Sequence, residues 1–191
     1  MRLQNETQAI AILRSGGIGV LPTDTLYGIV ACAADSRAVA RLYRLKSRER
    51  KPGTIIAANV EQFIELGVDE KYLRRVEQWW PNSLSIETPL GPELSYLHQG
   101  TDRQGLRVVP DARVRALLEQ TGPLLTSSAN LPGEQPANTV QEAYTYFGDL
   151  VDFYVDGGDR SGFSPSTLAR ITDKGFEIIR QGIFVVPDRG I

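Results

Sequence analysis

Short apolar segments and amphipathic segments follow one another along the whole chain in an irregular order. Brief apolar runs such as residues 18–23 and 54–58 predict buried strands, whereas residues 37–46 carry apolar side chains at helical spacing. Strict alternation would indicate a parallel sheet, and segregation would indicate α+β or separate domains. The intermixed order instead predicts one α/β domain with a twisted mixed β-sheet flanked by helices. We expect this single domain to span residues 1–191, because no repeat, low-complexity tract or linker divides the chain.

Capping residues and turn signals give the expected element boundaries. Helices are expected over residues 5–17, 37–46, 60–67, 69–80, 112–122 and 140–148, with caps from Asn5, Ser36, Asn59, Asp111 and Thr139. Strands are expected over residues 18–23, 26–34, 54–58, 84–89, 105–109, 123–128, 151–158, 166–171 and 176–182.

Composition excludes several classes of protein. The formal net charge of −2 argues against a general nucleic-acid binder, whose surface would be broadly basic. One cysteine, Cys32, and one histidine, His98, rule out an internal disulfide and the common zinc arrangements, so no protein-bound metal site is expected. Neither a P-loop nor a G-x-S-x-G motif occurs. The N-terminus lacks a signal-peptide core and no apolar run approaches the ~18 residues of a membrane span, so we expect a soluble, cytoplasmic protein.

A cationic cluster is the most unusual local feature. Between Arg41 and Lys51, six of eleven residues are Lys or Arg, and Glu49 is the only acid. One or two cations at a helix C-terminus would be worth roughly 0.3–1 kcal/mol, and a solvated helix end is one explanation. Six cations repel one another unless an anion lies among them. The cluster therefore favours a phosphate chain as ligand.

Three hydroxyl-rich segments follow predicted strands and could supply the rest of such a site. Small hydroxyl side chains allow backbone N–H groups to approach an anion, and an asparagine amide both donates and accepts. Each segment could also be an ordinary turn. The three are PTDTLYG (22–28), TSSAN (126–130) and SPST (164–167).

Taken in order, these motifs resemble those of the YrdC-type threonylcarbamoyl-AMP synthases, in their short, single-domain bacterial form. The resemblance extends from about Ile18 to Gly182. It departs from the family at Asn82 and Ser83, where Gly and Pro are usual, and at Arg170, where many members have Asp. The motifs that carry it are PTDTLYG, KSR, WWPNS, LRVVP, TSSAN, PST and IRQG.

The resemblance implies a YrdC-like fold and a nucleotidyltransferase, L-threonylcarbamoyladenylate synthase. Such an enzyme makes threonylcarbamoyl-AMP and pyrophosphate from L-threonine, bicarbonate and ATP. A tRNA-modifying transfer complex then uses the product for the threonylcarbamoyladenosine modification of tRNA. Mg²⁺ is implied with ATP and no metal bound by the protein itself. The resemblance leaves room for a weak direct contact with tRNA and implies no membrane association.

The resemblance also implies roles for individual residues. Lys46 and Arg48 would act in catalysis. The threonine site would comprise Thr25, Arg107, Thr126 and Ser166. The nucleotide site would comprise Lys46, Arg48, Lys51, Ser128, Asn130 and Arg180. We expect these residues to converge on one cleft, because several lie at predicted strand ends, with Tyr27 as an apolar wall.

Two other functions stay open at this point. One is a non-catalytic YrdC-like protein that binds RNA or a nucleotide, although the acidic balance weakens an RNA-backbone role. The other is a relative with the same fold and a changed substrate, which the intact KSR and SAN motifs disfavour.

Overall fold

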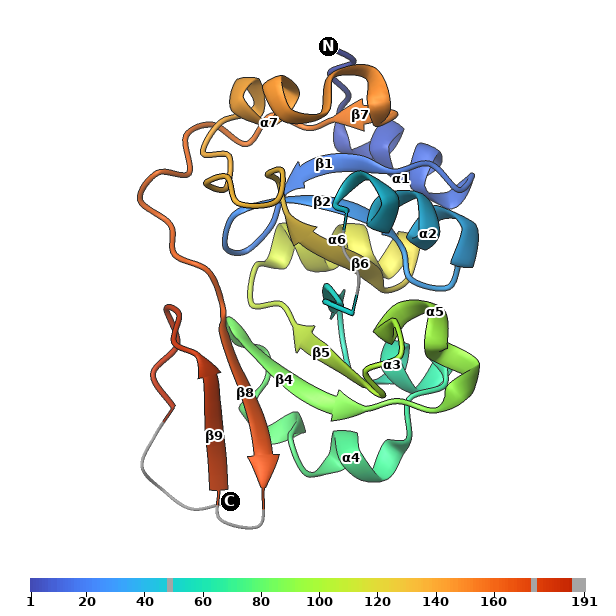
Figure 1. Ribbon diagram of the computed structural model, residues 1–191, viewed down its shortest axis with the longest axis vertical. Helices are drawn as coiled ribbons and strands as arrows, with labels where there is room; N and C mark the ends of the chain where they lie inside the picture. Colours follow the sequence, from blue (N-terminus) through green and yellow to red (C-terminus); the bar gives the residue numbers. More distant parts are fainter. Residues whose placement is uncertain (48–49, 173–174, 187–191) are drawn as a thin grey trace.

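A mixed β-sheet runs through the molecule in the computed structural model of the chain (Figure 1). The structure describes residues 1–47, 50–172 and 175–186. Within these residues, nine strands join in the order β7-β1-β2-β6-β3-β5-β4-β8-β9. The pairs β1/β7, β3/β5 and β4/β8 are parallel, and the other neighbours are antiparallel. The strands are β1 (Gly19–Pro22), β2 (Tyr27–Cys32), β3 (Thr54–Ala57), β4 (Leu84–Pro89), β5 (Arg103–Val108), β6 (Leu124–Ser128), β7 (Phe153–Tyr154), β8 (Thr167–Thr172) and β9 (Gly175–Arg180).

Helices lie on both faces of this sheet, and the predicted mixed α/β fold is confirmed. None of the helices in the described ranges combines the length and the apolar character needed to cross a bilayer. The α-helices are α1 (Glu6–Arg14), α2 (Ser36–Leu45), α3 (Glu61–Leu66), α4 (Glu70–Arg74), α5 (Ser95–His98), α6 (Ala112–Thr121) and α7 (Val140–Phe147), and 3₁₀ turns cover Glu77–Trp79, Pro92–Leu94 and Gly148–Leu150.

Side-chain caps fix where several helices begin. As predicted, Asn5, Asp111 and Thr139 cap α1, α6 and α7 by accepting hydrogen bonds from backbone N–H groups. The prediction that Ser36 caps α2 is wrong, because the helix begins at Ser36 itself. The carboxylate of Asp35 accepts from the N–H groups two and three residues ahead, so Asp35 is the cap.

The single helix expected over residues 69–80 is also wrong. α4 ends at Arg74, and a separate 3₁₀ turn covers Glu77–Trp79. The Trp80 ring packs on Phe63 at a centroid distance of 5.7 Å, and its Nε1 donates to the first carbonyl of β4 at 2.8 Å. Because the ring is buried between α3 and β4, the chain must leave the helical path. This tertiary contact is not visible in the local sequence pattern.

The two faces of the sheet are covered unequally. Side chains alternate between faces along a strand, so Ile55 and Ile56 of β3 enter two separate apolar clusters. The Ile55 side packs against residues of α2, α3, α4, α5 and α7, whereas the Ile56 side packs against α1 and α6. Thr54, Gly105 and Thr126 share a register on the Ile56 side, and they line a pocket rather than a helix. The site therefore forms on the part of this face that α1 and α6 leave open.

Candidate active site

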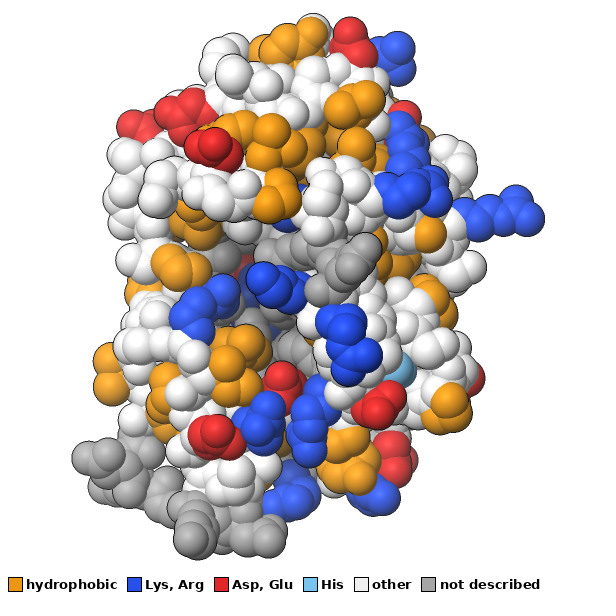
Figure 2. Space-filling view, in the orientation of Figure 1, with side chains coloured by type: hydrophobic (Ala, Val, Ile, Leu, Met, Phe, Trp, Pro, Cys, Tyr) orange, Lys and Arg blue, Asp and Glu red, His pale blue; other side chains and the backbone are white. Residues whose placement is uncertain are grey.

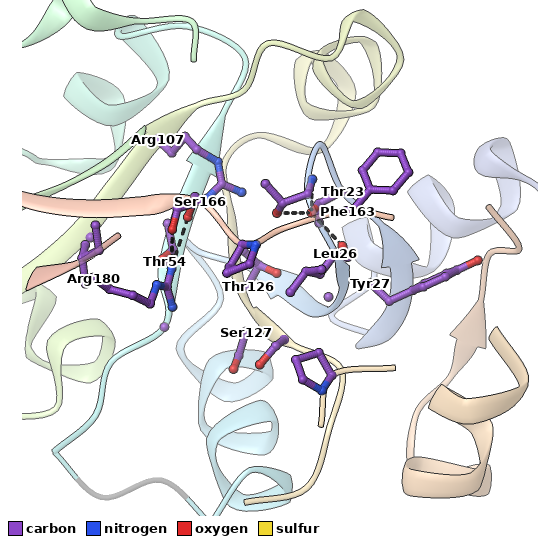
Figure 3. A pocket seen from close by; sticks show the side chains of 18 of the residues that line it. Thr23, Leu26, Tyr27, Thr54, Arg107, Thr126, Ser127, Phe163, Ser166 and Arg180 are labelled. Carbon is purple, nitrogen blue, oxygen red and sulfur yellow. Dashed lines mark hydrogen bonds between the residues drawn. The ribbon is translucent and has the colours of Figure 1, made fainter. Parts of the chain in front are cut away.

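A pocket of about 670 Å³ lies on this open part of the sheet (Figure 3). Its lining combines the β1–β2 turn, the strands β3, β4 and β5, the end of β6 and the segment that precedes β8. On the face seen in Figure 2, Lys and Arg side chains gather around a hollow in the middle of the molecule. A pocket with this rim is suited to an anionic ligand.

The β1–β2 turn presents two buried threonine hydroxyls. Thr23 Oγ1 donates to the Leu26 carbonyl at 2.8 Å, which uses its single proton. The Thr25 N–H donates to Thr23 Oγ1, and the hydroxyl oxygens of the two threonines lie 3.2 Å apart. Thr25 Oγ1 is therefore the donor in that pair, and its own lone pairs are left to accept a hydrogen bond in the pocket. Thr25 lines the pocket as predicted.

Arg107 enters the pocket from β5 as half of a buried ion pair. Its Nη2 lies 2.9 Å from Asp24 Oδ1, and the two side chains are 3% and 1% exposed. Ser83 donates to the second Asp24 oxygen at 3.0 Å, and Arg107 Nη1 donates to Ser85 Oγ at 3.0 Å. An arginine carries five N–H groups, so these contacts use two of them. The Arg107 Nε has no hydrogen-bond partner among the described residues.

A hydrogen-bonded chain continues from Arg107 to the far side of the pocket. Ser85 Oγ lies 3.0 Å from Ser166 Oγ. Arg180 Nη2 donates to the Ser166 carbonyl at 2.9 Å and lies 3.3 Å from its hydroxyl. Two guanidinium groups from different strands are thus joined through two serines. Figure 3 shows Ser166 with its contacts to Arg180, and Arg107 nearby. These hydrogen bonds hold both guanidinium groups in position before any ligand binds.

Among the members of the cationic cluster that the structure describes, Lys46 is the buried one. It follows α2 and is 2% exposed. Its Nζ donates to the Ser128 carbonyl at 2.8 Å, to Asn130 Oδ1 at 2.9 Å, and to the Asn130 carbonyl. Ser128 Oγ donates to Asn130 Oδ1 at 2.7 Å. Lys46 therefore holds the loop after β6 against the end of α2, although more than 80 residues separate them.

The other cations of the cluster lie in different surroundings. Arg41 pairs with Asp152 at 2.5 Å, away from the pocket. Arg44 is exposed on α2. Lys51 is also exposed, and its backbone N–H donates to a glutamine side chain at 3.2 Å. Arg48, predicted to act in catalysis and nucleotide binding, lies outside the described residues.

Tyr27 lies against the wall formed by residues 156–165. Its hydroxyl accepts from the Gly157 N–H at 2.7 Å and donates to the Gly158 carbonyl at 2.9 Å. Burial raises the pKa of the Tyr27 hydroxyl, so the group stays protonated and keeps both contacts. Phe163 of the same wall is 44% exposed at the pocket, with the Arg160 guanidinium 4.5 Å from its ring centroid. The strand expected over residues 151–158 is correspondingly shortened to β7.

Most of the predicted site residues come together. Lys46 and Asn130 are hydrogen-bonded to Ser128, which lines the pocket. Lys51 precedes Pro52, another residue of the pocket lining. Their roles in binding and catalysis stay predictions. The predicted residues that line the pocket are Thr25, Arg107, Thr126, Ser128, Ser166 and Arg180.

Three polar residues of the site were missed at the sequence level. Asp24 lies inside the PTDT motif, and Ser85 and Glu87 alternate with apolar residues along β4. That alternation places both β4 side chains on the pocket face and was a usable signal. The described residues contain no group of three or more His, Cys, Asp or Glu side chains that could hold a metal ion.

Comparison with known proteins agrees with this geometry. A sequence model of the family described as "Sua5_yciO_yrdC: Telomere recombination" matches residues 11–182. A threonylcarbamoyl-AMP synthase of Coxiella burnetii (strain RSA 493 / Nine Mile phase I) is 32% identical over 160 residues, covering 81% of this chain and 86% of the relative.

Solved structures show the same fold. The crystal structure of E. coli YciO matches with a TM-score of 0.78 and 26% identity, covering 93% of this chain and 89% of that one. P. abyssi Sua5 in complex with L-threonine matches with a TM-score of 0.79 and 25% identity over 93% of this chain. This chain spans 54% of that Sua5 chain, about half its length.

Guanidinium and hydroxyl groups converge on the open part of this sheet face, which defines an α/β domain with a pocket suited to a small anionic ligand. Among such domains, this chain belongs to the Sua5/YciO/YrdC family. The resemblance inferred from the seven sequence motifs is thereby confirmed.

Proposed function

We propose that this chain is an L-threonylcarbamoyladenylate synthase, which makes threonylcarbamoyl-AMP and pyrophosphate from L-threonine, bicarbonate and ATP. One observation carries the proposal: a single pocket joins Thr25 and Arg107 to Ser128 and Arg180, residues matched to the amino-acid and nucleotide sites of the family. The names of the relatives support it, as does the complex of Sua5 with L-threonine. A non-catalytic nucleotide- or RNA-binding role has no comparable support.

The pocket geometry suits the two bond-forming steps. The threonine amine attacks the bicarbonate carbon, an N–C bond forms, the C–OH bond of bicarbonate breaks, and the hydroxide leaves as water with a proton from the amine. A carbamate oxygen then attacks the α-phosphorus of ATP, an O–P bond forms, and the bond to pyrophosphate breaks. Both reactants of the second step are anions, so fixed cations must hold them together. Arg107 and Arg180, joined through Ser85 and Ser166, are such cations.

Individual groups have distinct tasks in this proposal. The N–H groups of Arg107 that Asp24 and Ser85 do not use hold the threonine carboxylate. Thr25 Oγ1 accepts a hydrogen bond from the amino acid. Lys46 keeps the Ser128–Asn130 loop in place and adds positive charge beside the phosphates. Mg²⁺ enters as part of the Mg·ATP substrate, coordinated by phosphate oxygens and water.

We further propose that the product passes to a tRNA-modifying transfer complex in the cytoplasm. Threonylcarbamoyl-AMP is a mixed anhydride and is short-lived in water, so a nearby acceptor system must consume it. In this proposal any direct contact with tRNA is weak, because the chain carries a net charge of −2.

The test is pyrophosphate release from ATP with bicarbonate and a series of amino acids. Release that depends on threonine is expected, and release without any amino-acid dependence would contradict the proposal. Two charge deletions provide a matched pair of variants. Arg48→Ala should abolish most turnover. Arg41→Ala should leave turnover close to wild type, because Arg41 pairs with Asp152 instead of lining the pocket.

A further inference from the structure

The pocket floor contains a carboxylate to which neither the motifs nor the proposed reaction gives a task. Glu87 of β4 lies opposite Gly105 of β5, which lies beside Thr54 of β3. All three line the pocket. Gly105 contributes no side chain; a Cβ there would lie 3.4 Å from Thr54 Oγ1 and 3.5 Å from Leu168 Cδ1. No side chain of β5 therefore rises between Thr54 and Glu87, and the Gly105 backbone itself forms the pocket floor there.

One oxygen of Glu87 is held by an ion pair, whereas the other belongs to a side chain that is 21% exposed at the pocket. Arg170 of β8 contacts Glu87 Oε2 through Nε at 2.6 Å and Nη2 at 2.5 Å. Its Nη1 lies 3.4 Å from Glu177 Oε2, on the next strand. Glu87 Oε1 accepts no hydrogen bond from the part of the chain that the structure describes. The ion pair thus holds an ionised acceptor at the pocket in a fixed orientation.

A carboxylate in this position limits what can bind beside it. An ionised carboxylate only accepts hydrogen bonds, so it needs a donor and repels phosphate. β4 lies three strands from β6, which carries Ser128, a distance of about 14 Å at the usual strand spacing. An extended nucleotide with its phosphates near Ser128 can reach across β3 and β5 and bring its nucleoside end toward Glu87. That end carries donors: the ribose hydroxyls and the amine of adenine.

The threonine amine is the competing donor. A carboxylate beside an amine stabilises its protonated form and raises its pKa. The amine must be neutral to attack the bicarbonate carbon, so a carboxylate at this point would oppose the first step. The chemistry therefore favours the nucleoside over the amino acid as the partner of Glu87.

We infer that Glu87, oriented by Arg170, is a specificity residue that accepts a hydrogen bond from the nucleoside end of the substrate. The inference rests on the proposed function for the identity of the nucleotide. It adds a selection step to the pocket, because a nucleotide without the matching donor leaves the Glu87 carboxylate desolvated and unpaired.

The experiment compares ATP with 2′-deoxy-ATP, 3′-deoxy-ATP and purine riboside triphosphate, which lacks the amine. The dissociation constant of each is measured by calorimetry, and kcat/KM by threonine-dependent pyrophosphate release. The wild-type protein should bind at least one analogue about 10- to 100-fold more weakly than ATP, the range expected when a charged acceptor loses its donor. The analogue affected identifies the hydroxyl or amine concerned.

Two variants isolate the carboxylate. In Glu87→Gln the amide oxygen can face Arg170 and its NH₂ group the ligand, so discrimination should fall to within about threefold. Glu177→Gln is the matched control, because it removes the other carboxylate on Arg170 without changing the pocket lining, and it should keep wild-type discrimination. If Glu87→Gln does not fold, the double variant Glu87→Leu/Arg170→Leu removes both charges together and should also lose discrimination.

Three results would overturn the inference. The first is equal dissociation constants of the wild type for all four nucleotides, and the second is unchanged nucleotide discrimination in the folded Glu87 variants. The third is a rise in threonine KM in these variants while the ratios of nucleotide dissociation constants stay unchanged. Absence of threonine-dependent pyrophosphate release in the wild type would reject the proposed function instead. The ratios of dissociation constants would still decide the role of Glu87.

Discussion

Replacing Asp24 with Asn removes one charge from the buried pair that positions Arg107. Asp24 accepts from Arg107 at 2.9 Å and from Ser83 at 3.0 Å, and its side chain is 1% exposed. Asparagine keeps the shape and one acceptor oxygen, so the hydrogen bonds can largely survive while the charge does not. The substitution therefore isolates the electrostatic part of the contact.

The magnitude follows from the burial of the pair. Leaving one member of a buried ion pair uncompensated costs about 3–5 kcal/mol, and the retained shape places Asp24→Asn near the lower end. Since 1 kcal/mol changes Tm by roughly 2–4 °C in a protein of this size, we expect Tm to fall by roughly 6–12 °C. The loss of charge also weakens the contact that orients Arg107 toward the amino acid, so threonine KM should rise about tenfold or more.

Thermal denaturation and steady-state kinetics measure the two effects. Glu6→Gln is the control, because it removes a carboxylate from the pair with Arg113, whose side chains are 38% and 63% exposed. An exposed pair contributes at most about 1 kcal/mol. If Asp24→Asn lowered Tm no more than this control and left threonine KM unchanged, the positioning role of Asp24 would be refuted.

Three other expectations use separate parts of the structure. Lys46→Met leaves three oxygens of residues 128–130 without their ammonium donor and should weaken ATP binding about tenfold or more by calorimetry; unchanged affinity would contradict the role given to Lys46. Burial, with a smaller effect of Asp35, raises the pKa of the Cys32 thiol from 9.0 to about 11. The folded protein should thus react slowly with a thiol reagent at pH 8, and fast labelling at that pH would show the thiol to be accessible. The protonated Cys32 thiol stabilises the folded state below pH ~9, and this contribution should be lost as the pH rises toward ~11. Serine lacks one methyl group of threonine, a difference worth ~1–3 kcal/mol, so its kcat/KM should be lower and that of glycine lower still; equal values for glycine and threonine would exclude a shaped pocket.

The parts of the site that could be predicted from the sequence are those marked by short local motifs. The PTDT, TSSAN and SPST segments combine strand ends with small hydroxyl residues, and both properties can be read from a few neighbouring positions. Their convergence was inferred from the general position of ligand sites at strand ends.

Long-range contacts set the limit of that prediction. Asp24 and Arg107 are 83 positions apart, and nothing near either residue shows that they form a pair. Tyr27 was expected as a wall and does line the pocket, but its hydroxyl anchors residues 157–158, a contact with a segment 130 positions away. The fold has the same limit, since the packing of Trp80 ended a helix that its local pattern would have continued.

The most direct test of the account is to incubate the purified chain with ATP, L-threonine and ¹³C-bicarbonate and to analyse the products by mass spectrometry. The account predicts pyrophosphate together with an adenylate that contains threonine and one ¹³C atom, and this adenylate should disappear when bicarbonate or threonine is omitted. An adenylate of threonine without the label, or pyrophosphate release with no threonine-containing adenylate, would contradict it.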